Sequence, residues 1–351
     1  MEIGVGLDPT LGLNWDQQRE VSQEAARLGY TSIWTPEGNG QDSFHLCVQR
    51  WQATTDVVLE GLTTGIAVSP VMYRTPLSFA MEGGTVSDIT GGKFIMGIGS
   101  GGAYRPQARA ALGVGRMSAL ALMRDYLSVI RPLVKGERVD YEGETTTLKG
   151  MRLAMRPAPE TPVYLGALGP RMLEMSGELA DGASLNWCTP EQIAWSRERI
   201  AEGAAKAGRN PSEINVAEYI RICVDDDVDA ARIALAKATM GYALGASVPT
   251  ERERQLGYRA HFERMGFTDE LADLDEMRKK GASRDEVAEA FPAEILQSVG
   301  YFGKADGAAA AFARLAEGLD TAIVRVVAAR RGVDSTLAVM EACKPEAVRA
   351  V

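Results

Sequence analysis

Short apolar segments alternate with amphipathic helical segments along almost the whole chain, and this alternation constrains the fold more than any other feature. The expected strands are residues 2–8, 31–35, 60–68, 93–99, 162–167, 182–187, 214–224 and 321–328. Strands that alternate with helices pair in parallel through right-handed crossovers. Eight such units without a G-x-G-x-x-G motif at the first turn favour a closed barrel over an open doubly wound sheet. We therefore predict an α/β fold of the (β/α)8 TIM-barrel class.

Two segments exceed what a plain barrel needs. Residues 136–161 contain VDYEGETTTLKG, a pattern typical of a β-hairpin that turns at Gly143. Residues 228–298 are polar and rich in helical patterns, and they are longer than one crossover requires. We expect a single domain over residues 1–351, with a hairpin insertion and a helical insertion before the last strand.

Composition and charge exclude several classes of function. The net charge of −9 disfavours nucleic acid as a partner, because an acidic protein repels a polyphosphate backbone. No stretch of about 20 apolar residues could span a membrane, and the first ten residues lack the pattern of a signal peptide. The four cysteines have no metal-site spacing, so we expect them to be reduced, as in a cytoplasmic protein. The chain has only two histidines, so a histidine-based metal site or a Ser-His-Asp triad is not expected.

In such barrels the active site lies at the carboxyl ends of the strands, and two of these ends are rich in glycine. One is the range 97–102, GIGSGG, where backbone N–H groups could bind a phosphate or polar oxygens. The other is the range 166–170, GALGP, which precedes a helix whose N-terminus would attract an anion. Both segments are equally consistent with ordinary turns at the end of a strand.

The ionisable residues at these ends are few. Glu37 follows the second strand and could donate a proton or orient a substrate, or could be a solvated loop residue. Asp8 either faces the site or caps a turn before Pro9. Tyr104 and Arg105 follow the first glycine segment, where an arginine could contact a phosphate. Cys188 lies near the mouth with nothing adjacent in sequence to activate it.

Three segments together resemble the luciferase-like monooxygenase superfamily, and most closely its branch that uses the deazaflavin coenzyme F420. They are LTTGIAVSPVMYRTPLSFA, GGKFIMGIGSGGA and TPVYLGALGPRMLEMSGELADGASLNWCTPEQ. The resemblance covers about residues 2–225 and 290–343. No single motif is unique to the family, but their order and spacing are fairly specific.

The resemblance implies a set of cofactor contacts. The third strand would end in a bulge with a non-prolyl cis peptide at Ile66–Ala67, behind the ring of the cofactor. The GIGSG segment would line the cofactor, and the GALGP segment would contact its phosphate. The predicted cofactor-binding residues are Asp8, Thr35, Ile66, Ala67, Ser69, Gly99, Ser100, Gly101, Gly166, Ala167, Leu168, Gly169 and Pro170.

The chain also departs from the sugar-phosphate dehydrogenases of this family. Those enzymes carry Asp-His after the second strand, where this chain has Pro36-Glu37, and Gly102 replaces an acidic residue. Glucose 6-phosphate is therefore not the expected substrate. We hypothesise that Glu37 takes the role of the catalytic acid.

The main interpretation is an F420-dependent oxidoreductase that transfers a hydride between the deazaflavin and a small organic substrate. The first alternative is an FMN-dependent monooxygenase, which would present the same ring pocket; basic residues at the mouth (Arg105, Arg109 and Arg116) suggest the longer acidic tail of F420. A non-catalytic cofactor-binding protein is the second alternative. A lyase or aldolase would need a lysine at a strand end, and no predicted end has one. The resemblance and base rates suggest a homodimer.

Overall fold

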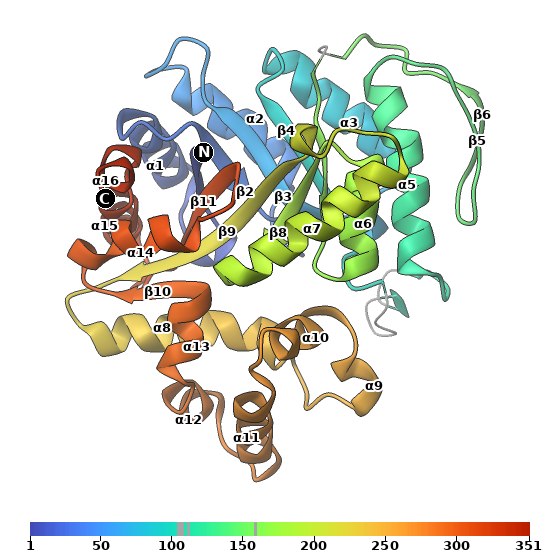
Figure 1. Ribbon diagram of the computed structural model, residues 1–351. Coiled ribbons are helices and arrows are strands. Elements are labelled where there is room, and N and C mark those ends of the chain that lie inside the picture. The colour runs from blue at the N-terminus through green and yellow to red at the C-terminus, as the bar shows by residue number, and fades with distance from the viewer. Residues whose placement is uncertain (104–108, 111–112, 158–159) are drawn as a thin grey trace.

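The computed structural model describes residues 1–103, 109–110, 113–157 and 160–351 (Figure 1). Its central feature is a closed barrel of parallel strands, in which the last strand pairs with the first. The barrel strands, in order, are β1 (Glu2–Gly6), β2 (Ser32–Thr35), β3 (Thr63–Pro70), β4 (Phe94–Gly99), β7 (Val163–Gly166), β8 (Gly182–Asn186), β9 (Asn215–Val224) and β11 (Thr321–Val326). The predicted fold class is confirmed.

Helices surround the barrel and begin where the sequence places their caps. Asn14 and Gln17 form the expected capping box of α1, and Thr75 and Thr189 cap helices that have proline at their first position. The helices outside the insertion are α1 (Trp15–Arg27), α2 (Ser43–Thr54), α3 (Pro76–Ile89), α5 (Ala119–Val134), α6 (Pro170–Leu179), α7 (Pro190–Lys206), α14 (Ala308–Leu315), α15 (Val333–Ala342) and α16 (Pro345–Arg349).

Both expected insertions are present. Strands β5 (Val139–Glu142) and β6 (Thr147–Met151) form the hairpin, which projects beside α5 (Figure 1). The carboxylate of Asp125 on α5 fixes its turn by accepting hydrogen bonds from the backbone of Thr145 and Thr146. The helical insertion gathers on one side of the barrel (Figure 1). It contains α8 (Val228–Ala243), α9 (Glu251–Arg254), α10 (Gly257–Arg264), α11 (Thr268–Lys279), α12 (Arg284–Glu289) and α13 (Ala293–Val299).

One strand is missing from the prediction. Residues Gly300–Gly303 form β10, which pairs in parallel with the end of β9 beside the barrel. Its sequence, GYFG, has two strand-favouring aromatic residues but a strand-disfavouring glycine at each end, so four residues give too little local pattern to predict a strand. Pairing with an already formed strand, and not sequence pattern, makes this segment extended.

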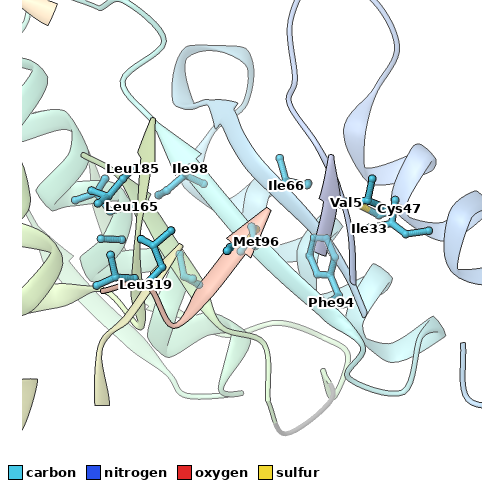
Figure 2. Packing of buried hydrophobic residues seen from close by; sticks show 14 of the residues in the cluster. Val5, Ile33, Cys47, Ile66, Phe94, Met96, Ile98, Leu165, Leu185 and Leu319 are labelled. Carbon is cyan, nitrogen blue, oxygen red and sulfur yellow. The ribbon is translucent and has the colours of Figure 1, made fainter. Parts of the chain in front are cut away.

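The core has an outer and an inner layer. The outer layer lies between strands and helices and is mostly aliphatic; Val5, Ile33, Ile66, Met96 and Leu165 belong to it (Figure 2). Inside the barrel, bulky side chains lie against glycines of neighbouring strands, so large and small residues alternate. The ring of Trp34 lies where a Cβ at Gly65 would be, and the ring of Tyr164 takes the same place at Gly182.

The four cysteines are all buried and unbridged. No helix in the described part of the chain combines the length and the apolar character needed to cross a membrane.

Candidate functional site

The two glycine segments meet at one edge of the barrel. Strands β4 and β7 are neighbours, so their carboxyl ends, Gly99 and Gly166, lie side by side. Both approach Val68: a Cβ at Gly99 would lie 2.6 Å from one methyl group of Val68, and a Cβ at Gly166 would lie 3.2 Å from each methyl. The glycines therefore make room for the end of β3, which the sequence did not reveal.

The end of β3 carries the bulge that the family resemblance implies, but its cis peptide is one residue later than predicted. The register with β4 shifts between Ile66 and Ser69, and the cis bond joins Ala67 to Val68 instead of Ile66 to Ala67. Ile66 is fully buried in the outer core, whereas Ala67 and Val68 are partly exposed. The motif located the segment, but the strand begins and ends later than expected, and the bond moves with it.

The loop after β4 is a tight turn, as one reading of the sequence proposed. Ala103 N–H donates to the carbonyl of Ser100 at 2.9 Å, and Gly101 has a φ of 56°. A Cβ at Gly101 would also lie 2.5 Å from the Cβ of Pro70, so only glycine fits there. The turn exposes Gly101 and part of Ser100, which leaves room for a ligand as well.

The loop before α6 has the features of an anion site. Gly169 is the N-cap; it offers no side-chain cap, and a Cβ there would meet nothing within 4 Å. The first turn has no acidic residue and carries Arg171, so the positive end of the helix is not neutralised. The backbone of the loop is held from two sides: Ala167 N–H donates to the Ser184 carbonyl at 3.2 Å, and Arg264 Nη2 donates to the Leu168 carbonyl at 2.7 Å.

Asp8 caps a turn and also contacts a barrel strand, so it has features of both roles that the sequence left open. Its carboxylate accepts a hydrogen bond from Thr10 N–H at 2.7 Å and forms an ion pair with Arg325 of β11. Thr35 is fully buried, and its hydroxyl donates to the carbonyl of Pro36 at 3.2 Å. Contact of either residue with a cofactor stays a prediction.

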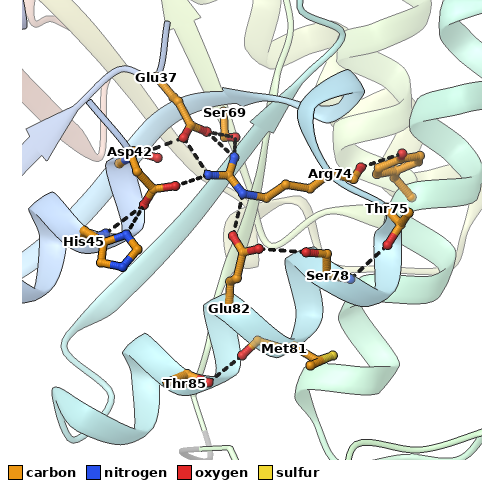
Figure 3. Close-up of polar contacts among 12 residues, drawn as sticks. Glu37, Asp42, His45, Ser69, Arg74, Thr75, Ser78, Met81, Glu82 and Thr85 are labelled. Carbon is orange, nitrogen blue, oxygen red and sulfur yellow. Dashed lines mark hydrogen bonds and ion pairs between the residues drawn. The ribbon is translucent and has the colours of Figure 1, made fainter. Parts of the chain in front are cut away.

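Glu37 is held in a buried ion-pair network and is not a solvated loop residue (Figure 3). Arg74 Nη1 and Nη2 each donate a hydrogen bond to one oxygen of Glu37, at 2.6 and 2.7 Å. Arg74 also forms ion pairs with Asp42 and Glu82. Ser69 donates its hydroxyl to the same carboxylate. Glu37 N–H donates to the Val68 carbonyl at 3.3 Å, so this network clamps the end of β2 to the bulge.

The basic residues expected at the mouth are only partly placed. Tyr104 and Arg105 lie outside the described residues. Arg109 donates to the carbonyl of Ala103 at 2.7 Å, which ties it to the first glycine turn, and Arg116 is exposed.

Several buried polar atoms inside the barrel have no hydrogen-bond partner among the described residues. Tyr219 and Ile323 belong to the interior cluster, and side chains two positions away along a strand share its face. Arg325 therefore points inward, as does Ser184, which pairs in register with Ala217 of the same cluster. The atoms without partners are Ser184 Oγ, Tyr219 Oη and Arg325 Nη1. A buried polar group without a partner is costly, so these three atoms are available to the polar groups of a ligand.

A contact that the sequence could not reveal joins the helical insertion to β8. His261 of α10 donates Nε2–H to the Trp187 carbonyl at 2.8 Å, and its Nε2 lies 3.8 Å from Cys188 Sγ. Arg264 Nη2 donates to the other ring nitrogen at 3.2 Å. Burial raises the pKa of the Cys188 thiol well above its usual value and lowers that of His261 to about 4. The pair is therefore a neutral structural contact, and not an activated nucleophile.

His261 should make the protein sensitive to acid. In the unfolded chain histidine binds a proton near pH 6.5, whereas folded His261 resists protonation down to about pH 4. The unfolded state binds more protons in this window, so stability falls as the pH falls, by roughly 3 kcal/mol between pH 7 and pH 4. Thermal unfolding across this range should show the wild type losing stability relative to the His261→Gln variant. His45→Gln, at the exposed histidine, is the control and should run parallel to the wild type; parallel curves for all three would contradict this account.

Comparison with known proteins agrees with this arrangement. The sequence profile of the luciferase-like monooxygenase family matches residues 2–322. A 5,10-methylenetetrahydromethanopterin reductase of Archaeoglobus fulgidus is 32% identical over 254 residues, which cover 72% of this chain and 73% of that protein.

Solved structures share the fold over the full length. The coenzyme F420-dependent tetrahydromethanopterin reductase of Methanopyrus kandleri superposes with a TM-score of 0.77 at 22% identity, covering 99% of both chains. An F420-dependent secondary alcohol dehydrogenase, solved with an F420-acetone adduct, gives a TM-score of 0.75 at 17% identity, again over 99% of both. With a family profile that spans most of its length, the chain belongs to the luciferase-like monooxygenase family.

Proposed function

We propose that this protein is an oxidoreductase that uses coenzyme F420 and transfers a hydride between the deazaflavin and a small organic substrate. The observation that carries the proposal is the meeting of both glycine segments with the β3 bulge at the carboxyl end of the barrel. The reductase of Archaeoglobus fulgidus, at 32% identity, supports the choice of redox chemistry.

The residues present fit such a cofactor. The N-terminus of α6, uncapped and next to Arg171, would hold a phosphate of its tail. The partly exposed backbone at Ala67 and Val68, with the glycines behind it, would support a flat ring. The unpartnered Ser184 and Tyr219 hydroxyls could satisfy polar atoms at the edge of the ring. Bound F420 supplies a carbon centre that accepts or donates a hydride; the protein orients it and excludes water.

Glu37 remains our candidate for the catalytic acid, although its contacts favour a supporting role. Both of its oxygens accept hydrogen bonds from Arg74, so the carboxylate is committed to a guanidinium group within the protein. Through Ser69 and the Val68 carbonyl it also fixes the bulge that backs the proposed ring.

The proposal predicts that F420 binds and that FMN does not. Titration followed by F420 fluorescence should show saturable binding, which should be weaker by about tenfold in Gly169→Asp, because a carboxylate at the N-terminus of α6 repels phosphate. Gly169→Ser is the matched control: serine caps the helix equally well but adds no charge. Binding of FMN with F420 ignored would favour the monooxygenase alternative, and binding of neither would overturn the proposal.

A further inference from the structure

One buried arginine at the carboxyl end of the barrel has no acidic partner in the part of the chain that the structure describes. Arg221 lies two residues after Tyr219 on β9, so its side chain shares the inward face of that strand. It pairs in register with Arg325 of β11, which places two inward-facing guanidinium groups on neighbouring strands. Arg325 is neutralised by Asp8, whereas Arg221 has no carboxylate partner among the described residues. Arg221 is nevertheless only 4% exposed.

The contacts of Arg221 leave one edge of its guanidinium group unused. Nη1 donates to the side-chain oxygen of Asn186 and to the Tyr219 carbonyl. The guanidinium carbon lies 3.8 Å from the ring centre of Trp187 and 5.3 Å from that of Tyr242, so aromatic rings cover its faces. In the described part of the chain, Nε and Nη2 have no hydrogen-bond partner. Asn186 and Tyr242 are partly exposed, so this group of residues reaches the rim of the barrel.

Other buried arginines also have single N–H groups without a partner, but their remaining contacts are made with carboxylates or backbone carbonyls. Arg259 binds Asp275 at 2.7 Å and Glu263 at 2.6 Å. Arg50 lies on α2, outside the barrel, and its two Nη groups donate hydrogen bonds to the carbonyls of Trp34 and Leu7. Arg221 differs because its unused edge lies on the side of the barrel where the glycine segments and the bulge end.

The nearest acidic residue on the same strand does not compensate for this charge. Glu218 pairs in register with Leu185, on the outward face, and accepts a hydrogen bond from Cys188 N–H at 2.6 Å. Burial raises the pKa of Glu218 to about 8, so the side chain is largely protonated at neutral pH. A buried guanidinium group in such a setting gains the most from an anionic ligand.

We propose that Arg221 binds a carboxylate group of the substrate through its Nε and Nη2 edge. Two parallel N–H donors in one plane match the two oxygens of a carboxylate. Trp187, Tyr242 and Tyr258 would pack against the remainder of the molecule, which makes a small carboxylic acid with an apolar or aromatic body the preferred class. This inference rests on the proposed function, because it names the substrate class of that same site.

Binding of benzoate tests the inference without knowledge of the substrate. Isothermal titration of the full chain should show benzoate binding, while benzamide, equal in shape but uncharged, should bind at least about tenfold more weakly. Arg221→Met should lose roughly ten- to a hundredfold in benzoate affinity, and Arg221→Lys should recover only part of it. Arg199→Met is the control, since Arg199 also lies against a tryptophan, Trp195, but on the outside of the barrel. F420 affinity should be unchanged in all variants.

The outcomes separate this inference from the proposed function. Equal affinities for benzoate and benzamide, or no benzoate binding by a protein that binds F420, would overturn the assignment of Arg221 while the F420 proposal stands. Benzoate binding that depends on Arg221 in a protein that ignores F420 would support the anion site and overturn the cofactor. If inorganic phosphate competes as well as benzoate, the site is a general anion site and the carboxylate class is wrong. The comparison of benzoate with benzamide uses wild-type protein, so it decides the matter even if Arg221→Met does not fold.

Discussion

Replacement of Arg74 by methionine is expected to lower the free energy of unfolding by about 3–5 kcal/mol, the usual cost of removing one partner of a buried ion pair. The side chain of Glu37 is only 4% exposed, and the loss of Arg74 leaves its charge unpaired next to Asp42 and Glu82. Methionine retains the length that packs against Phe44 and Phe79, so the charge is the main change. Urea unfolding followed by circular dichroism measures the effect.

The control is Arg124→Met, which removes an equally well-formed pair with Glu178 at the surface. Both side chains of that pair are substantially exposed, so the expected loss is below about 1 kcal/mol. Equal losses for the two variants would contradict the view that Arg74 neutralises a buried cluster.

Glu37→Gln separates the two roles of this glutamate. Combined with Arg74→Met it should restore part of the lost stability, because no buried charge is then left unpaired. Alone, it should abolish turnover with F420 bound normally if Glu37 is the catalytic acid. Unchanged turnover would remove that hypothesis and leave the clamp on the bulge as its role.

Gly97→Ala is expected to lower the free energy of unfolding by about 3 kcal/mol or more, which is at or above the usual cost of overpacking. An added Cβ would lie 2.0 Å from the carbonyl oxygen of Ile66, which is backbone and cannot rotate away. The bulge would have to move, so we expect a lower melting temperature and loss of F420 binding together.

Gly169→Ala is the matched control for Gly97→Ala, because the space around Gly169 is open and its φ of −91° suits any residue. It should change the melting temperature by only a few degrees. If Gly97→Ala retained both stability and F420 affinity, the bulge would not depend on this close approach.

The features that sequence reasoning predicted are those set by local pattern. The strands, the capping box at Asn14 and the caps at Thr75 and Thr189 each depend on residues within one turn or one strand. The carboxyl-end rule then located both glycine segments, because parallel strands bring their ends to one edge.

The features that it missed depend on residues brought together by closure of the barrel. Arg74 is 37 positions from Glu37, and nothing in either neighbourhood indicates the pair. His261 is 73 positions from Cys188 and lies in a segment whose helices could be predicted but whose docking could not. The error of one residue in the cis bond has the same origin, because the register between β3 and β4 decides where the bulge forms.

The two polar contacts of α10 have a consequence for protein engineering. His261 holds the backbone after β8, and Arg264 holds the backbone just before α6. A chimera that replaced residues 228–299 with the corresponding segment of a relative, to change the molecules it accepts, would also remove two supports of the loop that precedes the proposed phosphate site. Exchanges that keep an imidazole and a guanidinium group at these two places should therefore be tolerated better than exchanges that keep only the length and the helical pattern.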